Sequence, residues 1–397
     1  MSAENSKTSS PSASMRWIYD PKVRGVIFQL LAVAAVIWML FYFVSNALHN
    51  METRGISTGF GFLENRASFG IAQTLISYTE NDTYARAFLI GLLNTLLVSG
   101  IGIILATILG FLIGIARLSN NWLLSRAAAV YIEIFRNIPL LLQVFFWYIC
   151  VLRTLPGPRQ SLSLADSFFL NIRGLYLPAP IPESGFGFVA GAFVIAIAAV
   201  IYLIRWSKRR KELTGEPFPV FSASLGVLIG LPLVVFLISG MPMHFDYPGL
   251  KGFNFQGGIS IIPELFAMIL ALTIFTAASI AEIVRSGIMS VSKGQREAAD
   301  SLGLKNGLTL RFIIIPQSMR VIIPPLTSQY LNLVKNSSLA TAIGYPDLVS
   351  VFMGSTLNQT GQAVEIIAMT MAVYLVISIT TSVLMNMYNA KKALVER

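Results

Sequence analysis

One polar segment between two apolar stretches has the residue types and the spacing of a binding surface. Residues 294–316 read GQREAADSLGLKNGLTLRFIIIP. They fit the spacing Glu-Ala-Ala, three residues, Gly, nine residues, Ile, two residues, Pro, and the residues at the fixed positions are Glu297, Ala298, Ala299, Gly303, Ile313 and Pro316. We expect Glu297 in the first turn of a short helix, where the helix dipole favours an anion. Gly303 can take the left-handed conformation that ends this helix, and Pro316 is expected to limit the next one. The segment therefore predicts a compact helix-turn-helix knob outside the bilayer, suited to a groove on a partner protein.

A second set of polar residues interrupts an apolar stretch closer to the carboxyl end. Gln329, Asn332 and Asn336 occupy positions i, i+3 and i+7, so a helix presents them on one stripe. Amides donate and accept hydrogen bonds, which suits a small ligand that carries both an ammonium and a carboxylate group. Lys335 flanks the stripe. The alternative is that these residues join neighbouring spans or hold an interface between subunits.

Two charged pairs are spaced by one helical turn. Glu282 and Arg285 lie near the end of one apolar stretch, and Glu133 and Arg136 near the start of another. Residues three apart face each other on a helix, so each pair predicts a structural ion pair. A role in an inner gate is the alternative, because charges at membrane depth often mark a transport path.

The sequence offers no catalytic, metal or cofactor site. His49 and His244 are far apart, Cys150 is the single cysteine, and neither a Ser-His-Asp set nor an HExxH motif is evident. A phosphate-binding loop for ATP needs a Gly-Lys dipeptide, and this sequence contains none. We therefore expect neither an enzyme nor a nucleotide-hydrolysing subunit.

Composition places the chain in a bilayer. Hydrophobic residues make up 55% of its 397 residues, charged residues 12%, and mean hydropathy is +0.69; a soluble domain has about 25% charged residues. Each candidate span is near the roughly 20 residues that cross a membrane. The sequence predicts eight such spans, at 25–47, 88–116, 127–151, 186–204, 219–239, 263–285, 321–342 and 363–387. The seventh carries the amide stripe, so it must face protein or water.

The basic residues predict the orientation. With a cytoplasmic amino terminus, the cytoplasmic segments hold 20 of the 29 lysines and arginines, including five within 205–211. Both termini are then cytoplasmic, with 1–20 as a disordered tail and 391–397 as a short one. The net charge of +10 is thus a topology signal, and nucleic-acid binding is not needed to explain it. The outer segments at 48–87, 152–185 and 240–262 are expected to form a partly ordered docking surface.

The knob spacing resembles the coupling loop of permease subunits of ATP-binding-cassette (ABC) importers. Three further runs resemble the polar amino-acid uptake branch of that family: 133–143 (EIFRNIPLLLQ), 281–288 (AEIVRSGI), and 316–329, which contains Pro316, Gln317, Arg320, Pro324, Pro325 and Gln329. The resemblance covers about 88–152 and 262–390. Residues 153–261, with two extra spans, fall outside the common five-span pattern, as in the larger permeases of bacterial general L-amino-acid importers.

This resemblance implies an all-α polytopic membrane protein of the bacterial inner membrane. It would have a type I ABC importer transmembrane-domain core with two extra spans. Residues 21–87 would form the first span and a periplasmic segment, and 88–390 the permease domain, with 153–261 inserted. The amide stripe with Lys335 would line the substrate path.

The resemblance also implies partners. They are a second, related permease, two copies of an ABC ATPase bound through 294–316, and a periplasmic amino-acid-binding protein. Such subunits usually form a heterodimer, although the sequence alone leaves a homodimer open. A motor-independent secondary transporter or channel is the alternative, but it would leave the knob unexplained and would need buried ion-coupling carboxylates. An intramembrane enzyme would need paired catalytic groups within the spans.

Overall fold

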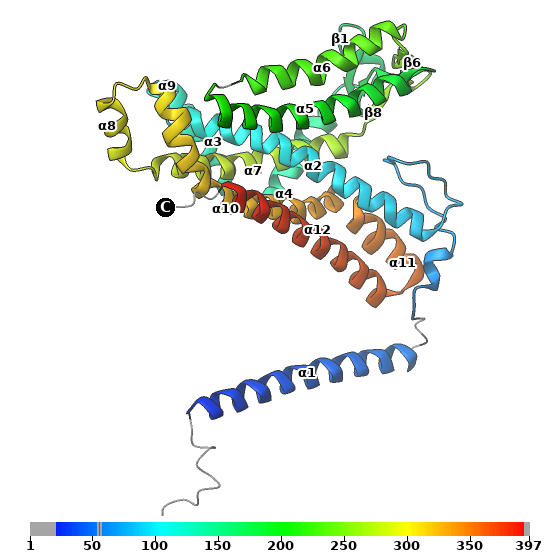
Figure 1. The fold of residues 1–397 in the computed structure, drawn as a ribbon. Coiled ribbons are helices and arrows are strands. Elements are labelled where there is room, and N and C mark those ends of the chain that lie inside the picture. The colour runs from blue at the N-terminus through cyan, green and yellow to red at the C-terminus, as the bar shows by residue number, and fades with distance from the viewer. Residues whose placement is uncertain (1–20, 54, 56–57, 217, 393–397) are drawn as a thin grey trace, which may run out of the picture.

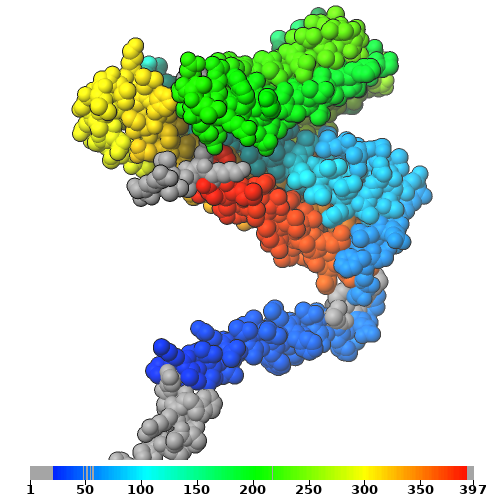
Figure 2. Space-filling model, in the orientation of Figure 1, coloured from blue at the N-terminus to red at the C-terminus, as the bar shows by residue number. Residues whose placement is uncertain are grey.

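The computed structural model is largely helical and describes residues 21–53, 55, 58–216 and 218–392. The tails predicted at 1–20 and 391–397 lie outside these residues, apart from Lys391 and Lys392 at the end of the last helix. The first helix, α1 (Pro21–Thr53), lies apart from the other helices in Figures 1 and 2. Its apolar side chains are exposed along its length. A surface of this kind needs lipid or another membrane helix around it.

The core is built on two long helices that pack closely, α2 (Tyr84–Arg117) and α7 (Pro263–Met289). Small residues allow this approach. A side-chain carbon at Gly110 would lie 2.6 Å from the Cβ of Ile280, and one at Gly114 would lie 2.7 Å from the carbonyl oxygen of Ala281. The two glycines form a G-x-x-x-G pattern, which brings helices together in membranes. Helix α10 (Ile315–Asn336) packs on α7, and α12 (Ala363–Lys392) packs on α10.

The third predicted span, 127–151, is not one straight helix. It comprises α3 (Trp122–Asn137) and α4 (Leu140–Phe145) with its continuations η3 (Phe146–Val151) and η4 (Leu152–Thr154), and the chain bends by 105° between the two parts. Pro139 causes the break, because the residue before a proline is pushed out of the helical conformation. The Gln143 side chain donates hydrogen bonds to the carbonyl oxygens of Phe135 and Ile138, at 3.0 and 2.9 Å. These bonds satisfy two backbone carbonyl groups that have no helical hydrogen-bond partner at the break.

The predicted total of eight spans is not confirmed. Among the described residues, six helices are long and apolar enough to cross a membrane, or seven if the bent α3–α4 pair is one span. The predicted span 321–342 corresponds to α10. This segment is helical, but it is too polar to count among the six, because amides, Lys335 and two internal prolines lie in it. Beyond it, the chain forms η7 (Ser337–Ile343), η8 (Val349–Thr356) and α11 (Leu357–Thr360).

A buried polar loop joins these short helices to α2. The side-chain amide of Asn94 donates to the carbonyl oxygens of Gln73 and Pro346, at 2.8 and 2.9 Å, and the Leu348 backbone N–H donates to Thr95. Buried backbone groups outside regular structure need such partners. The bonds fix the loop between η7 and η8 against α2.

The inserted region forms a helical hairpin and short strands. Helices α5 (Phe186–Thr214) and α6 (Val220–Ile238) pack against each other. In Figure 2 they form a ridge separate from α12. The strands, which sequence analysis did not predict, are β1 (Leu162–Leu164), β2 (Phe168–Asn171), β3 (Gly174–Leu177), β4 (Ala179–Pro182), β5 (Met243–Asp246), β6 (Gly249–Lys251), β7 (Asn254–Gln256) and β8 (Ile259–Ile261).

All the strand pairs are antiparallel. The largest sheet has the order β1-β2-β3-β8, while β4 pairs with β5 and β6 with β7. Leu175 of β3 lies opposite Ile261 of β8, so segments far apart in sequence join in one sheet. Short 3-10 turns η2 (Gly61–Glu64) and η5 (Pro158–Gln160) complete this end. The outer segments are therefore more regular than predicted.

Three of the segments predicted to be cytoplasmic lie at one end of the molecule, as far as the described residues go. Figure 1 shows the turn between α5 and α6, the knob helices α8 and α9 (bounds below) and the carboxyl end of α12 on one side, with the strands at the opposite end. This arrangement agrees with the alternation of inner and outer segments that the basic residues predict.

Candidate functional site

The knob is a short helix followed by a second helical segment. It consists of α8 (Lys293–Ser301), α9 (Asn306–Thr309) and the π-helical turn η6 (Leu310–Ile314), which leads into α10. Gly303 ends α8 with a φ of +70°. Its N–H donates to the Asp300 carbonyl oxygen at 2.9 Å, and the Leu304 N–H donates to that of Ala299 at 3.1 Å. These two bonds form a Schellman cap, so the predicted left-handed glycine is confirmed.

Two predicted details of the knob are wrong. Glu297 is the fifth residue of α8, and the first turn of that helix holds no acidic residue. Pro316 does not end a helix; it lies in the first turn of α10, which continues to Asn336. A proline is tolerated there because its missing N–H costs little at a helix start, and the widened η6 turn precedes it.

The spaced residues of the knob divide by exposure. Glu297, Ala298, Gly303 and Pro316 are exposed, Ile313 is half-buried, and Ala299 is buried. Ala299 therefore packs inside the knob, while Glu297 and Ala298 face outward.

Sequence analysis missed two apolar residues on the knob surface. The side chains of Leu302 and Phe312 are 79% and 65% exposed. The signal was present, because both are large apolar residues within or beside a polar segment. Since the knob lies beyond the apolar spans, these side chains favour a protein partner over lipid.

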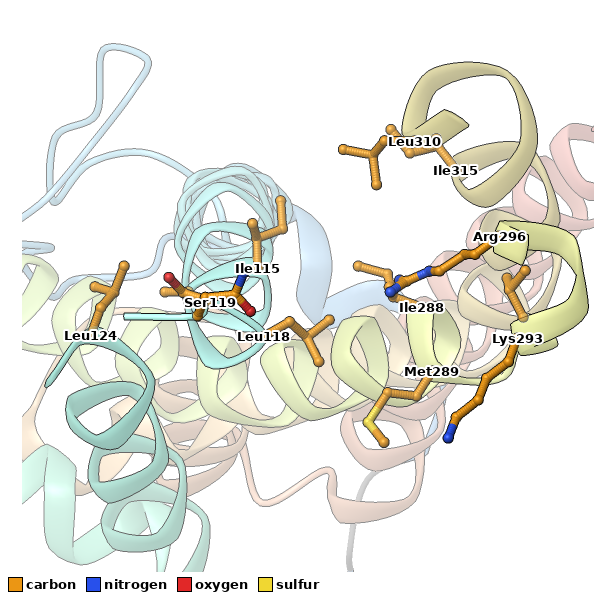
Figure 3. A pocket seen from close by; sticks show the side chains of 13 residues that line it. Ile115, Leu118, Ser119, Leu124, Ile288, Met289, Lys293, Arg296, Leu310 and Ile315 are labelled. Atoms are coloured by element: carbon orange, nitrogen blue, oxygen red, sulfur yellow. The ribbon is translucent and has the colours of Figure 1, made fainter. Parts of the chain in front are cut away.

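A cavity of about 680 Å³ separates the knob from the ends of α2 and α7 (Figure 3). Its apolar walls come from three places: Ile115 and Leu118 on α2, Ile288 and Met289 on α7, and Leu310 and Ile315 beyond α9. Two cationic side chains from α8, Lys293 and Arg296, also line it.

Arg320 is a third residue that sequence analysis did not single out as a site. Together with Gln295 and Gln317 it lines a cavity of about 380 Å³ at the base of the knob. Its Nε and Nη2 atoms are buried and have no hydrogen-bond partner among the described residues. Two buried N–H donors without acceptors are costly, so a carbonyl or carboxylate from a partner would fit here.

The three amides that the periodicity placed on one helical stripe line a cavity between α10 and α7. Gln329, Asn332 and Asn336 border a space of about 360 Å³, and the other lining residues are Phe275, Thr276, Ser279 and Leu333. Thr276 and Ser279, which sequence analysis did not name, add two hydroxyls. Among the described residues the three amides have no hydrogen-bond partner. Lys335 is exposed and does not line this cavity.

The two predicted ion pairs have different outcomes. In α7, Arg285 Nε donates to Glu282 Oε2 at 2.9 Å, and both side chains are 28% exposed. Arg117 and Arg136 lie near enough to act electrostatically on Glu282. Glu133 and Arg136 are both exposed, and this pair of described residues forms no ion pair. Arg136 therefore contributes to the surroundings of Glu282 instead.

No group of three or more histidine, cysteine or acidic residues could hold a metal within the part of the chain that the structure describes. Cys150 is exposed.

Comparison with known proteins gives consistent matches. Residues 213–393 match the family of binding-protein-dependent transport system inner membrane components. A chain of Escherichia coli (strain K12) named as an amino-acid ABC transporter permease, YhdX, is 56% identical over 95% of this chain and 96% of its own length. The general L-amino acid transport system permease AapQ of Rhizobium johnstonii is 51% identical, over 96% of this chain and 95% of AapQ. The glutamate/glutamine/aspartate/asparagine transport system permease BztB of Rhodobacter capsulatus is 42% identical, over 96% of each chain.

Proposed function

The chain belongs to the permease subunits of amino-acid ABC importers, and on that premise we propose that residues 294–316 couple it to a separate ATPase. Its role as a membrane subunit for amino-acid transport follows from the family. The finer assignments concern which partners it binds, through which residues, and where the substrate passes.

The observation that carries the coupling proposal is the set of side chains that the knob exposes. Glu297 and Ala298 face outward, and Leu302 and Phe312 expose apolar surface beyond the spans. A small helix whose outward face carries the short side chain of Ala298 can enter a groove, and exposed leucine and phenylalanine side chains gain free energy when a partner covers them. The cavity behind the knob separates it from the ends of α2 and α7.

We place the substrate path along the α10–α7 cavity. Its amides and hydroxyls are uncharged, so they can bind the ammonium and carboxylate groups of an amino acid without holding it too tightly for release. The names of AapQ and BztB indicate general and acidic or amide L-amino acids, and we propose L-amino acids of this range as substrates. An interface role for the same amides remains the alternative.

We propose three kinds of partner. They are two copies of an ABC ATPase on the cytoplasmic side, a periplasmic amino-acid-binding protein on the outer side, and a second, related permease that forms a heterodimer. The exposed apolar face of α1 offers surface for the second permease. In this arrangement the protein lies in the bacterial inner membrane with both termini in the cytoplasm.

The test is a charge reversal on the knob in the whole transporter. Glu297→Lys should lose the ATPase subunit on affinity purification, or keep it while transport stops, because a cation replaces the outward anion. The matched control is Glu64→Lys, a glutamate that is also exposed but lies in η2, outside the knob. Membrane insertion is checked by the yield of folded protein in detergent. If Glu297→Lys retains the ATPase and transports at the rate of the control, the coupling assignment is wrong.

A further inference from the structure

The amphipathic end of α5 extends beyond the apolar part of that helix. The apolar stretch ends at Ile204, and the helix continues to Thr214 with Arg205, Lys208, Arg209, Arg210 and Lys211. Ten residues of helix add about 15 Å. The basic residues therefore begin where the hydrocarbon ends and continue through the headgroup layer.

One face of this helix end borders an open surface cavity of about 480 Å³, and every lining residue belongs to α5 itself. The lining residues are Tyr202, Arg205, Trp206, Lys208, Arg209 and Glu212. Three of them, Tyr202, Arg205 and Arg209, follow the i, i+3 and i+7 spacing of one helical stripe, and Lys208 lies three residues after Arg205. Tyr202 is 70% exposed and Trp206 39%. Tyrosine and tryptophan favour this depth, where one side of the ring meets acyl chains and the other meets water.

The cations of the cavity are not neutralised by the protein. Arg210, outside the cavity, pairs with Glu216 at 3.1 Å and lies 5.5 Å over the Trp206 ring. This contact, together with the edge of Trp206 against Phe218 at 5.3 Å, holds the indole in place. Arg205, Lys208 and Arg209 have no carboxylate partner among the described residues. Glu212 also lines the space, so three cations and one anion leave an excess of two positive charges.

We propose that this cavity binds the phosphate headgroup of an anionic phospholipid. Arginine and lysine side chains bind phosphate oxygens through charge-assisted hydrogen bonds, and a lipid held there can lay its acyl chains along the apolar part of α5. An acidic partner protein would not need the aromatic residues at interfacial depth. The inference depends on the position of α5 in the bilayer, and it does not depend on the coupling proposal.

The binding site would position a part of the molecule that few protein contacts hold. Only 11% of the most apolar stretch of α5, and none of that of α6, is buried inside the protein. The two helices pack mainly on each other. A lipid that bridges the basic end of α5 to the membrane surface would fix the height of this hairpin.

The experiment measures stabilisation of the purified full-length protein in detergent by short-chain phosphatidylglycerol and, separately, by phosphatidylcholine. Replacing Arg205, Lys208 and Arg209 together with glutamine should weaken the apparent affinity for phosphatidylglycerol by about tenfold or more. Glu212→Gln should strengthen it severalfold, because it removes the one anion of the cavity. The charge-matched control replaces Arg159, Arg173 and Lys251, which are exposed at the strand end, and should leave the affinity unchanged.

A second measurement does not depend on the folding of the triple variant. Brominated phosphatidylglycerol should quench tryptophan fluorescence more in the unaltered protein than in Trp206→Phe, and brominated phosphatidylcholine should show no such difference. The proposal is overturned if the control triple variant loses affinity for phosphatidylglycerol to the same extent. It is also overturned if phosphatidylglycerol stabilises the protein no more than phosphatidylcholine does. Stabilisation of the protein by millimolar glycerol phosphate in the absence of lipid would instead identify a site for a soluble phosphate and would overturn the lipid proposal.

Discussion

At the scale of single residues, backbone conformation and side-chain exposure define the knob. Gly303 is required because its φ of +70° places it in the left-handed region, and the surrounding space is open, so only the backbone restricts the residue type. The same reasoning failed at Pro316, because a proline in the first turn of a helix is compatible with that helix. Its position in the first turn of α10 depends on the η6 turn, which no sequence pattern showed.

Gly303→Val should weaken coupling to the ATPase. A β-branched residue in the left-handed conformation costs about 1–2 kcal/mol, which would shift or unwind the end of α8. Transport by the reconstituted complex is the measurement. Gly307→Val is the matched control, because Gly307 lies in the same knob with an ordinary φ and open space around it. Equal transport by the two variants would show that the cap does not matter for coupling.

At the scale of elements, close contact between α2 and α7 organises the core. Gly110 and Gly114 face Ile280 and Ala281, and the apolar patterns of the two helices predicted spans at these places. The bend between α3 and α4 and the polar helix α10 are departures from simple spanning helices. Both occur where prolines and amides interrupt apolar runs.

Gly110→Val should destabilise the protein by about 1–3 kcal/mol, because the new side chain overlaps Ile280. Thermal unfolding in detergent, followed by loss of monodisperse protein, is the measurement. Gly100→Val on the same helix is the control, since nothing lies within 4 Å of a side-chain carbon there. A melting temperature for Gly110→Val that matches the control would contradict the close approach of α2 and α7.

The amide stripe on α10 gives a prediction about transport. Gln329→Leu or Asn332→Leu should change the substrate preference or the transport rate severalfold while the complex still assembles, because an amide that faces the cavity is lost. Uptake of several L-amino acids into proteoliposomes is the measurement. Ser328→Leu, exposed on the same helix but outside the cavity, should have little effect. Loss of the second permease on purification of the two amide variants would identify the stripe as an interface.

At the scale of the whole molecule, orientation in the membrane would decide on which side each proposed partner binds. The knob, the α5–α6 turn and the end of α12 share one side, opposite the strands. Basic residues predict that this side is cytoplasmic. The strands then form a structured surface on the outer side, where a binding protein would dock.

Labelling with a membrane-impermeant thiol reagent tests this orientation. In a Cys150→Ala background, cysteines at Ser301 and Lys211 should stay unlabelled in intact spheroplasts, whereas cysteines at Asn65 and Arg173 should react. All four positions are exposed in the structure, so permeabilised cells should label each of them and serve as the control. The opposite pattern would place the knob on the outer side and remove the basis for coupling to a cytoplasmic ATPase.

The sequence by itself determined the membrane class, the family, the position of the knob and the shared face of the three amides. These follow from local composition and from helical period, which do not depend on distant contacts. Tertiary structure alone decided the outer sheet, because β3 pairs with β8 across the inserted helices. It also decided the unpartnered guanidinium of Arg320 and the cavity that Thr276 and Ser279 share with α10. Each of these depends on residues that are far apart in sequence and meet only when the helices pack.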